Sequence, residues 1–179
     1  MLDINAEAFE KAITKAVMRE IPLEVGQTAV RFYKKNFERQ GFVDNGVKRW
    51  KPTKRAKTKP ILTGEKGGGK LRRSIRLESY SAERIVITAG NQFVPYAKIH
   101  NEGGIINESV QVRSHVRKKH YRRRKGRRQL VEQYTVKAHK RHMNIRIPKR
   151  QYMGQSETLN RHIDIITKRA INKAFQTLF

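Results

Sequence analysis

The chain contains no cysteine and few acidic residues: its 179 residues hold 15 Asp or Glu against 41 Lys or Arg. The absence of cysteine excludes disulfides, thiolate metal sites and cysteine nucleophiles. No apolar run approaches the roughly 20 residues of a membrane-spanning helix. The N-terminus has neither the basic start nor the apolar stretch of a signal peptide. We therefore expect a protein that works in a reducing cytosol, or in a particle assembled there.

The positive charge is concentrated in one part of the chain. The formal net charge is +26, and residues 109–150 carry 16 Lys or Arg with a single acid, Glu132. A compact body repels so much like charge, so we expect a polyanion to neutralise it in the working state. An amphipathic basic helix of the kind that binds membrane surfaces is absent, which favours nucleic acid over an anionic membrane or an acidic protein. The predicted contact residues are nine cations: Arg117, Lys118, Lys119, Arg122, Arg123, Arg124, Lys125, Arg127 and Arg128.

The basic segment contains an internal repeat. Residues 110–117 match residues 134–141 at a constant offset of 24, and both copies alternate apolar or aromatic with polar side chains. A period of two is typical of β-strands. The cationic run lies between the copies, with Gly126 near its middle, so the pattern predicts a long antiparallel hairpin with a strongly positive tip. A disordered basic loop between two short strands is the alternative.

Both ends of the chain have the periodicity of amphipathic helices. Residues 4–40 predict two helices. Asn5 is expected to cap the first, Pro22 to lie in the first turn of the second, and Gly41 to end the second as a left-handed residue. A third helix is expected from Ser156 to the C-terminus. The second helix is expected to bury Val25, Ala29, Phe37 and either Phe32 or Tyr33.

The middle of the chain predicts a long loop and then strands. Residues 42–70 are rich in Gly, Pro and cations, and Trp50, the only Trp, is expected to pin this loop to the rest of the protein. The glycine triplet at residues 67–69 lacks the spacing of a phosphate-binding loop. Strands are expected as a hairpin at residues 73–90, as a further strand at 93–100 and as a short edge strand at 145–148. The predicted class is α+β, with N- and C-terminal helices packed on a mainly antiparallel sheet.

The acidic residues do not form a catalytic constellation. A nuclease gathers Asp and Glu around a divalent metal. Asp44, Glu65, Glu102 and Glu108 instead lie in predicted loops without recognisable motif spacing. We therefore predict a protein that is not an enzyme and has no catalytic residue.

The histidines also give no clear metal site. His139 and His142 are three residues apart, so on the predicted strand they point to opposite faces. His115 and His139 are equivalent positions of the repeat, and a zinc site that joins them across the hairpin is the alternative. Repeated surface histidines in a cation-rich strand explain the pattern better. We predict no metal and no cofactor.

Four fragments of the chain follow one another in a recognisable order. The first joins Gln40-Gly41-Phe42 to Trp50-Lys51-Pro52, and the second joins Leu62-Thr63-Gly64 to Lys70-Leu71-Arg72-Arg73-Ser74-Ile75. The third is Tyr96-Ala97-Lys98-Ile99-His100-Asn101-Glu102-Gly103-Gly104, and the fourth is Ile147-Pro148-Lys149-Arg150-Gln151-Tyr152-Met153-Gly154. In their order, their spacing and the helix that follows them, these fragments resemble the phage virion morphogenesis family, the tail-completion proteins of Mu-like tailed phages.

This resemblance implies a small α+β protein of the phage neck. It implies a homo-oligomeric ring, a hexamer or a dodecamer, in the virion at the head–tail junction, assembled in the host cytoplasm. The expected partners are the portal or connector protein, the tail-tube or tail-terminator protein, and double-stranded DNA that passes through the ring; no membrane is involved. Two departures from the family pattern are the lengthened link at residues 65–69 and residues 108–147, which we interpret as a basic hairpin arm inserted in a single domain of residues 1–179.

Two other functions compete with this interpretation. A nucleic-acid-binding module of the ribosomal or RNA-chaperone type also uses basic hairpins, and Tyr121 and Tyr134 are candidates for stacking on bases. Co-purification with RNA favours that module, and isolation with phage particles favours the neck protein. A metal-dependent nuclease is a weaker alternative, which a plasmid-cleavage assay with magnesium tests.

Overall fold

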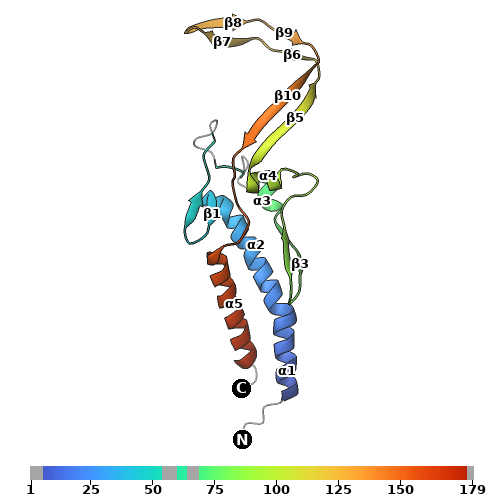
Figure 1. Cartoon of the computed structure of the whole chain (residues 1–179), viewed down its shortest axis with the longest axis vertical. Coiled ribbons are helices and arrows are strands. Elements are labelled where there is room, and N and C mark those ends of the chain that lie inside the picture. The colour runs from blue at the N-terminus through green and yellow to red at the C-terminus, as the bar shows by residue number, and fades with distance from the viewer. Residues whose placement is uncertain (1–5, 54–59, 64–68, 177–179) are drawn as a thin grey trace. The chain divides into compact units, whose positions relative to one another are not determined.

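The computed structural model of the chain describes residues 6–53, 60–63 and 69–176. It contains two compact units. We call residues 105–147 the arm and the other described residues the body. Helices lie at both ends of the chain and strands pair in antiparallel hairpins, which confirms the predicted α+β class (Figure 1). No helix of the described residues is long and apolar enough to cross a membrane.

A single continuous helix replaces the two helices predicted for residues 4–40. It has three segments: α1 (Ala6–Lys15), the π-helical η1 (Ala16–Glu20) and α2 (Ile21–Arg39). Glu20 and Ile21 keep right-handed helical backbone angles, so the chain does not break between segments. Pro22 has no N–H to donate, and the wider π turn before it accommodates the missing bond without ending the helix. The predicted cap, Asn5, lies outside the described residues.

The left-handed residue that ends α2 is Gln40, with a φ of 53°, rather than the predicted Gly41. The backbone N–H of Gln40 donates to the carbonyl oxygens of Asn36 and Phe37. Its side-chain amide donates to the carbonyl oxygen of Ile61 at 3.1 Å and accepts the Ile61 N–H. These bonds hold a non-glycine residue in a conformation that ordinarily favours glycine.

Part of the predicted loop at residues 42–70 is a regular hairpin. β1 (Gly41–Val43) pairs antiparallel with β2 (Val47–Arg49). A Cβ on Gly41 would lie 2.7 Å from the carbonyl oxygen of Lys48, so this close pairing requires glycine. Each strand has three residues, which is too short to produce a visible alternation in the sequence. Most of the glycine triplet lies outside the described residues.

The next hairpin confirms the strands predicted within residues 73–90. The elements are α3 (Lys70–Arg73), β3 (Arg76–Tyr80) and β4 (Ile85–Thr88), and β3 pairs antiparallel with β4. A β-bulge shifts the register between Leu77 and Ser79. The hairpin packs on α2, where a Cβ on Gly26 would lie 2.6 Å from Cδ1 of Leu77. Glycine in mid-helix therefore allows the strand to approach closely.

The strand predicted at residues 93–100 is wrong, because this segment forms a turn and the short helix α4 (Ala97–Glu102). The Asn91 carbonyl oxygen accepts the N–H of Val94 at 2.8 Å, and the Asn91 side chain accepts the N–H of Phe93 at 2.9 Å. Asparagine stabilises turns by such local bonds, and here they prevent an extended strand.

The predicted C-terminal helix is confirmed as α5 (Glu157–Gln176). Ser156 caps it as expected: its Oγ accepts the N–H of Leu159 at 3.2 Å and donates to the carbonyl oxygen of Val43 at 2.9 Å. α5 runs beside α2 (Figure 1), and the two helices pack together. The cap therefore also ties the start of α5 to β1.

The core of the body lies between α2, α3, α4 and the segment before α5. Its buried residues are Phe37, Trp50, Leu71, Ile75, Val94, Ala97 and Tyr152. The rings of Phe37 and Trp50 meet edge to face at 5.3 Å, and Trp50 Nε1 donates to the Gln151 carbonyl oxygen at 2.7 Å. Trp50 therefore pins its segment as predicted. The expected stripe of α2 is buried as well, with Phe32 rather than Tyr33 as its fully buried aromatic.

The strands form separate two-stranded ladders, not the single sheet that we expected. In the described residues each strand pairs with one neighbour. Residues 145–147 do not join β3 and β4, because they belong to β10 of the arm. The arm contains three ladders: β5 (Gly104–Val112) with β10 (His139–Ile147), β6 (His115–Arg117) with β9 (Tyr134–Val136), and β7 (His120–Arg124) with β8 (Arg127–Val131). Whether the arm is an insertion in a single domain stays a prediction.

Candidate nucleic-acid interface

The turn between β7 and β8 is a tight two-residue connection. Lys125 and Gly126 have φ values of 47° and 80°, both in the left-handed region. Two such residues in succession are typical of a type I′ turn, whose twist matches that of paired antiparallel strands. Gly126 takes this conformation without strain. The turn therefore fixes the register of the most basic hairpin in the chain.

The register of this hairpin places like charges opposite one another. The opposed pairs are His120–Val131, Tyr121–Leu130, Arg122–Gln129, Arg123–Arg128 and Arg124–Arg127. Like charges in direct opposition destabilise a ladder. The two Arg–Arg pairs consequently contribute nothing favourable to the fold of the isolated hairpin. Their presence suggests that these arginines bind a partner outside the hairpin.

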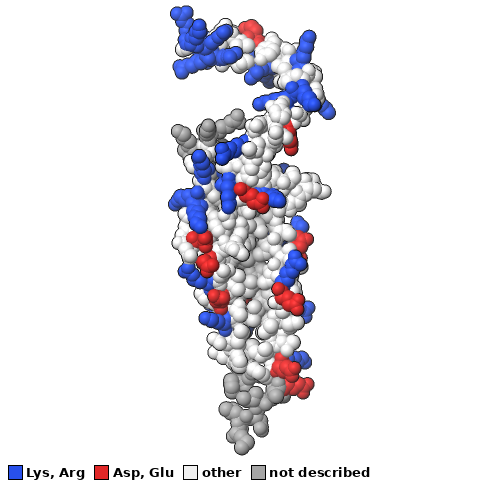
Figure 2. Space-filling view, viewed as in Figure 1, with Lys and Arg blue, Asp and Glu red and all other residues white. Residues whose placement is uncertain are grey.

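The cations of the arm have no acidic partner within the described residues. Residues 105–147 contain 14 Lys or Arg and two acids, Glu108 and Glu132, a net charge of +12. All ion pairs of the described residues lie in the body: Lys15–Glu20, Lys48–Asp44, Arg72–Glu38 and Arg76–Glu78. Figure 2 shows Lys and Arg side chains spread over the arm with few acids among them. The charge of the arm is therefore available to an external anion.

Two arginines of the arm hold exposed tyrosines. The guanidinium carbon of Arg128 lies 4.1 Å from the ring centroid of Tyr121, a cation–π contact. Arg117 Nη1 donates to the hydroxyl oxygen of Tyr134 at 3.3 Å. Both rings remain exposed, at 59% for Tyr121 and 43% for Tyr134. The arginine contacts hold the two tyrosine side chains in place, and no core covers them.

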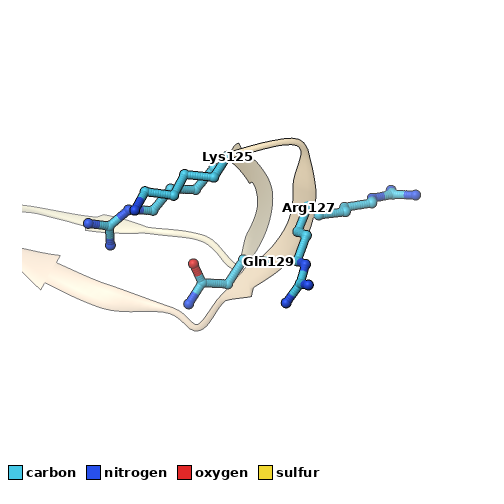
Figure 3. A pocket seen from close by; sticks show the side chains of 5 residues that line it. Lys125, Arg127 and Gln129 are labelled. Atoms are coloured by element: carbon cyan, nitrogen blue, oxygen red, sulfur yellow. The ribbon is translucent and has the colours of Figure 1, made fainter.

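A shallow, open hollow of about 570 Å³ lies at the hairpin tip. Figure 3 shows the side chains of Lys125 and Gln129 extending back along the hairpin. The lining residues are Arg124, Lys125, Arg127, Arg128 and Gln129. Four cations and an amide offer only donors of charge-assisted hydrogen bonds plus one amide oxygen. Such a lining suits phosphate oxygens.

All nine predicted contact residues are exposed, but they do not occupy one kind of position. Arg117 ends β6, and Lys118 and Lys119 form the interruption between β6 and β7. The other six lie in the β7–β8 hairpin, where four of them line the hollow. Gln129 was missed because an isolated glutamine carries no signal of its own. Only the register places it opposite Arg122.

A recurring histidine bond at the strand interruptions was also missed. His115, His120 and His139 each begin a strand after a two-residue interruption. In each, Nδ1 lies 2.9–3.1 Å from the backbone carbonyl oxygen two residues earlier. A carbonyl oxygen only accepts, so Nδ1 carries the proton in this bond. The sequence signal is a basic residue two positions before each histidine.

The zinc alternative receives no support from the described residues, in which no three metal-ligating side chains come together. Glu102 lies in α4 and Glu108 in β5, so neither is in a loop as predicted. Asp44 pairs with Lys48 and accepts the N–H of Glu157 at 3.1 Å, and these bonds, that of Lys48 first, lower the pKa of Asp44. Asp44 therefore stabilises the start of α5. Glu65 lies outside the described residues.

Comparison with known proteins identifies one family. A model of the phage virion morphogenesis family matches residues 5–172, nearly the whole chain. Neither a curated protein nor a solved structure matches it. The chain therefore belongs to the phage virion morphogenesis family, as its sequence fragments indicated, and its role is structural, in building a phage virion.

Proposed function

We propose that this member of the phage virion morphogenesis family is a neck protein that forms a closed ring at the head–tail junction, around the path of the DNA. The observation that carries the proposal is the arm, whose 14 cations have no ion-pair partner among the described residues. Family membership supplies the setting, a phage virion, and the polyanion proposed for it is double-stranded DNA. The arm supplies a surface of matching charge.

The chemistry of the arm suits DNA that has to move. Contacts from Lys and Arg to phosphate bind without reading sequence, and their strength falls as salt rises. A channel lining needs this kind of contact, since a base-specific grip holds one sequence and stops passage. The hollow of the hairpin tip offers cationic donors and one amide, Gln129, in place of a deep specific pocket.

The proposed assembly is a homo-oligomer with cyclic symmetry, a hexamer or a dodecamer. A head-to-tail contact closes into a ring when its rotation divides a full turn evenly. In the virion the ring contacts the portal or connector protein on one side and the tail-tube or tail-terminator protein on the other. The protein has no catalytic role in this proposal.

The test uses a phage that lacks the gene and is supplied with the protein from a plasmid. The arm variant changes Arg122, Arg123, Arg124, Arg127 and Arg128 to Gln. A matched control changes five exposed cations of the body, Lys11, Lys35, Lys168, Arg169 and Lys173, to Gln. Without the protein we expect filled heads and separate tails in electron micrographs, with joining restored by the control more than by the arm variant.

The same preparations decide between the proposal and its competitor. Purified virions should contain the protein in a multiple of six copies, located at the neck by labelling. Protein that is missing from virions and instead co-purifies with RNA would favour the ribosomal or RNA-chaperone interpretation. Joined, infectious particles in the complete absence of the protein would rule out the neck role.

A further inference from the structure

The body contains a buried arginine without a counter-ion. Arg150 is 7% exposed, yet none of the ion pairs in the described part of the chain includes it. Its Nε is buried and has no hydrogen-bond partner. Burial lowers the pKa of Arg150, because the charged guanidinium loses hydration. A largely buried charge without a counter-ion destabilises a fold, so its presence calls for a function.

A second unpaired polar atom belongs to His100, whose backbone is bonded to that of Arg150. The backbone N–H of Arg150 donates to the carbonyl oxygen of His100 at 2.8 Å, which joins the segment after the arm to α4. Nδ1 of His100 is also buried without a partner. Burial, and then the charge of Arg150, lower the pKa of His100, so the two side chains are close enough to interact electrostatically. Two residues that are far apart in the sequence thus lie side by side, and each carries a buried polar atom without a partner.

The backbone around these two side chains is held firmly. A Cβ on Gly103, whose φ is 78°, would lie 2.8 Å from the backbone nitrogen of Lys149, so glycine lets the two segments touch. Oδ1 of Asn101 accepts the N–H groups of Tyr152 and Met153 at 2.9 and 3.0 Å. This scaffold fixes Arg150 and His100 before any ligand arrives, which reduces the entropic cost of binding.

We propose that Arg150, with His100 beside it, forms a binding notch for an oxyanion supplied from outside the chain. Of the three guanidinium nitrogens, only Nε is both fully buried and unpaired, so any anion that reaches Arg150 binds through the two terminal nitrogens. A planar guanidinium binds two oxygens of a carboxylate or phosphate side by side. An oxyanion there supplies the negative charge that the described residues do not.

Two sources offer this chemistry. One is a carboxylate of a neighbouring subunit, a source that rests on the proposed ring. The other is free inorganic phosphate, which is independent of the ring. Glu102 is the internal candidate, since its charge acts on nearby Tyr152, but it makes no ion pair with Arg150.

Thermal unfolding of the full chain tests the notch itself. Arg150→Met removes the unpaired charge and keeps the apolar stem, so we expect the Tm of the isolated protein to rise by about 4 °C. Arg73→Met, at an exposed arginine of the body, should leave Tm unchanged. A lower Tm for R150M would overturn the notch, because Arg150 would then stabilise the fold. A lower Tm for Glu102→Gln together with no gain for R150M would assign the carboxylate to this chain and also overturn it.

Phosphate and phage complementation then separate the two sources. If free phosphate binds, it raises the Tm of the wild type and of R73M more than that of R150M, and it raises the pKa of His100 measured by NMR. If a neighbouring carboxylate binds, phosphate acts equally on all three proteins, while R150M folds but fails to join heads to tails. If R150M is stable, restores head–tail joining fully and responds to phosphate like the wild type, the notch is refuted. The arm variants would then still test the neck role independently.

Discussion

The body and the arm of this protein differ in burial and in the pairing of their charged side chains. The body is assembled around a buried aromatic core, and its ion pairs join some of its cations to acids. Every residue of the arm is described and none of them is buried, although 14 of the 43 residues are Lys or Arg. The body therefore owes its stability to its own contacts. The arm has a regular backbone without a core, which leaves its side chains free for a partner.

The largest expected effect is a difference in stability between the two regions. Phe37→Ala in the body should lower the free energy of unfolding by about 4 kcal/mol, because Phe37 is fully buried between Trp50 and Tyr152. Leu130→Ala in the arm should change it by less than about 0.5 kcal/mol, since Leu130 is 45% exposed. Urea unfolding followed by circular dichroism measures both. Equal decreases would mean that the arm shares a core with the body.

The second effect is on binding and should be confined to the arm. The five-fold Arg→Gln variant of β7 and β8 should flatten the dependence of log affinity for duplex DNA on log salt by roughly 0.9 for each phosphate that the variant no longer neutralises. The matched body variant should leave the slope near that of the wild type. Fluorescence anisotropy with two unrelated DNA sequences measures this. An unchanged slope in the arm variant would indicate that the arm docks on a protein and does not bind DNA.

A third prediction compares one turn from each region. Gly46 and Gly126 both have positive φ, and a Cβ on either meets nothing within 4 Å. Alanine at either position therefore costs only backbone strain, about 1 kcal/mol. We expect Gly46→Ala to lower the Tm of the body. Gly126→Ala should leave that Tm unchanged and only speed amide hydrogen exchange in β7 and β8. A common drop in Tm would show that both regions unfold together.

The smallest expected effect is a pH dependence that belongs to the body alone. His100 has a lowered pKa when folded, because of burial and then of the Arg150 charge. The unfolded chain therefore binds a proton at His100 more tightly than the folded chain does. The stability that neutral His100 contributes is complete above the ordinary histidine pKa of 6.5 and is lost as pH falls below it. Tm measured from pH 7.5 to 5 should fall less in His100→Gln than in the wild type. A parallel fall in both proteins would contradict the prediction.

The helices were predictable because their signals are local. The α2 stripe of Val25, Ala29 and Phe37 shows the helix period, and Ser156 stands one residue before α5, where a capping side chain is needed. The turn at Asn91 carries a local signal too, because asparagine favours turns, and a strand at residues 93–100 is inconsistent with it. Gln40 could not be recognised as a left-handed residue, because the bonds that hold it come from Ile61, 21 residues away.

The candidate sites divide in the same way. The nine cations of the arm were visible because a run of like charge needs no partner in the sequence. The pairing of Arg124 with Arg127 follows from the Lys125-Gly126 turn, and the pattern predicted a hairpin there. The meeting of Arg150 with His100 was invisible, since it depends on two segments 50 residues apart that touch through Gly103. A run of charged residues can be recognised in a sequence, whereas a charge without a counter-ion can be recognised only in the folded structure.

The interruptions of the arm have a consequence for how such a protein changes its length. Residues 118–119 on one strand and 132–133 on the other are both two-residue gaps, so the ladders before and after them keep the same register. Removal of residues 119–132 would leave Arg117 and Tyr134 as an opposed pair, joined by residues 118 and 133 as a two-residue turn. Evolution or an engineer can therefore shorten the arm by whole ladders, in one deletion, without altering the pairing that remains.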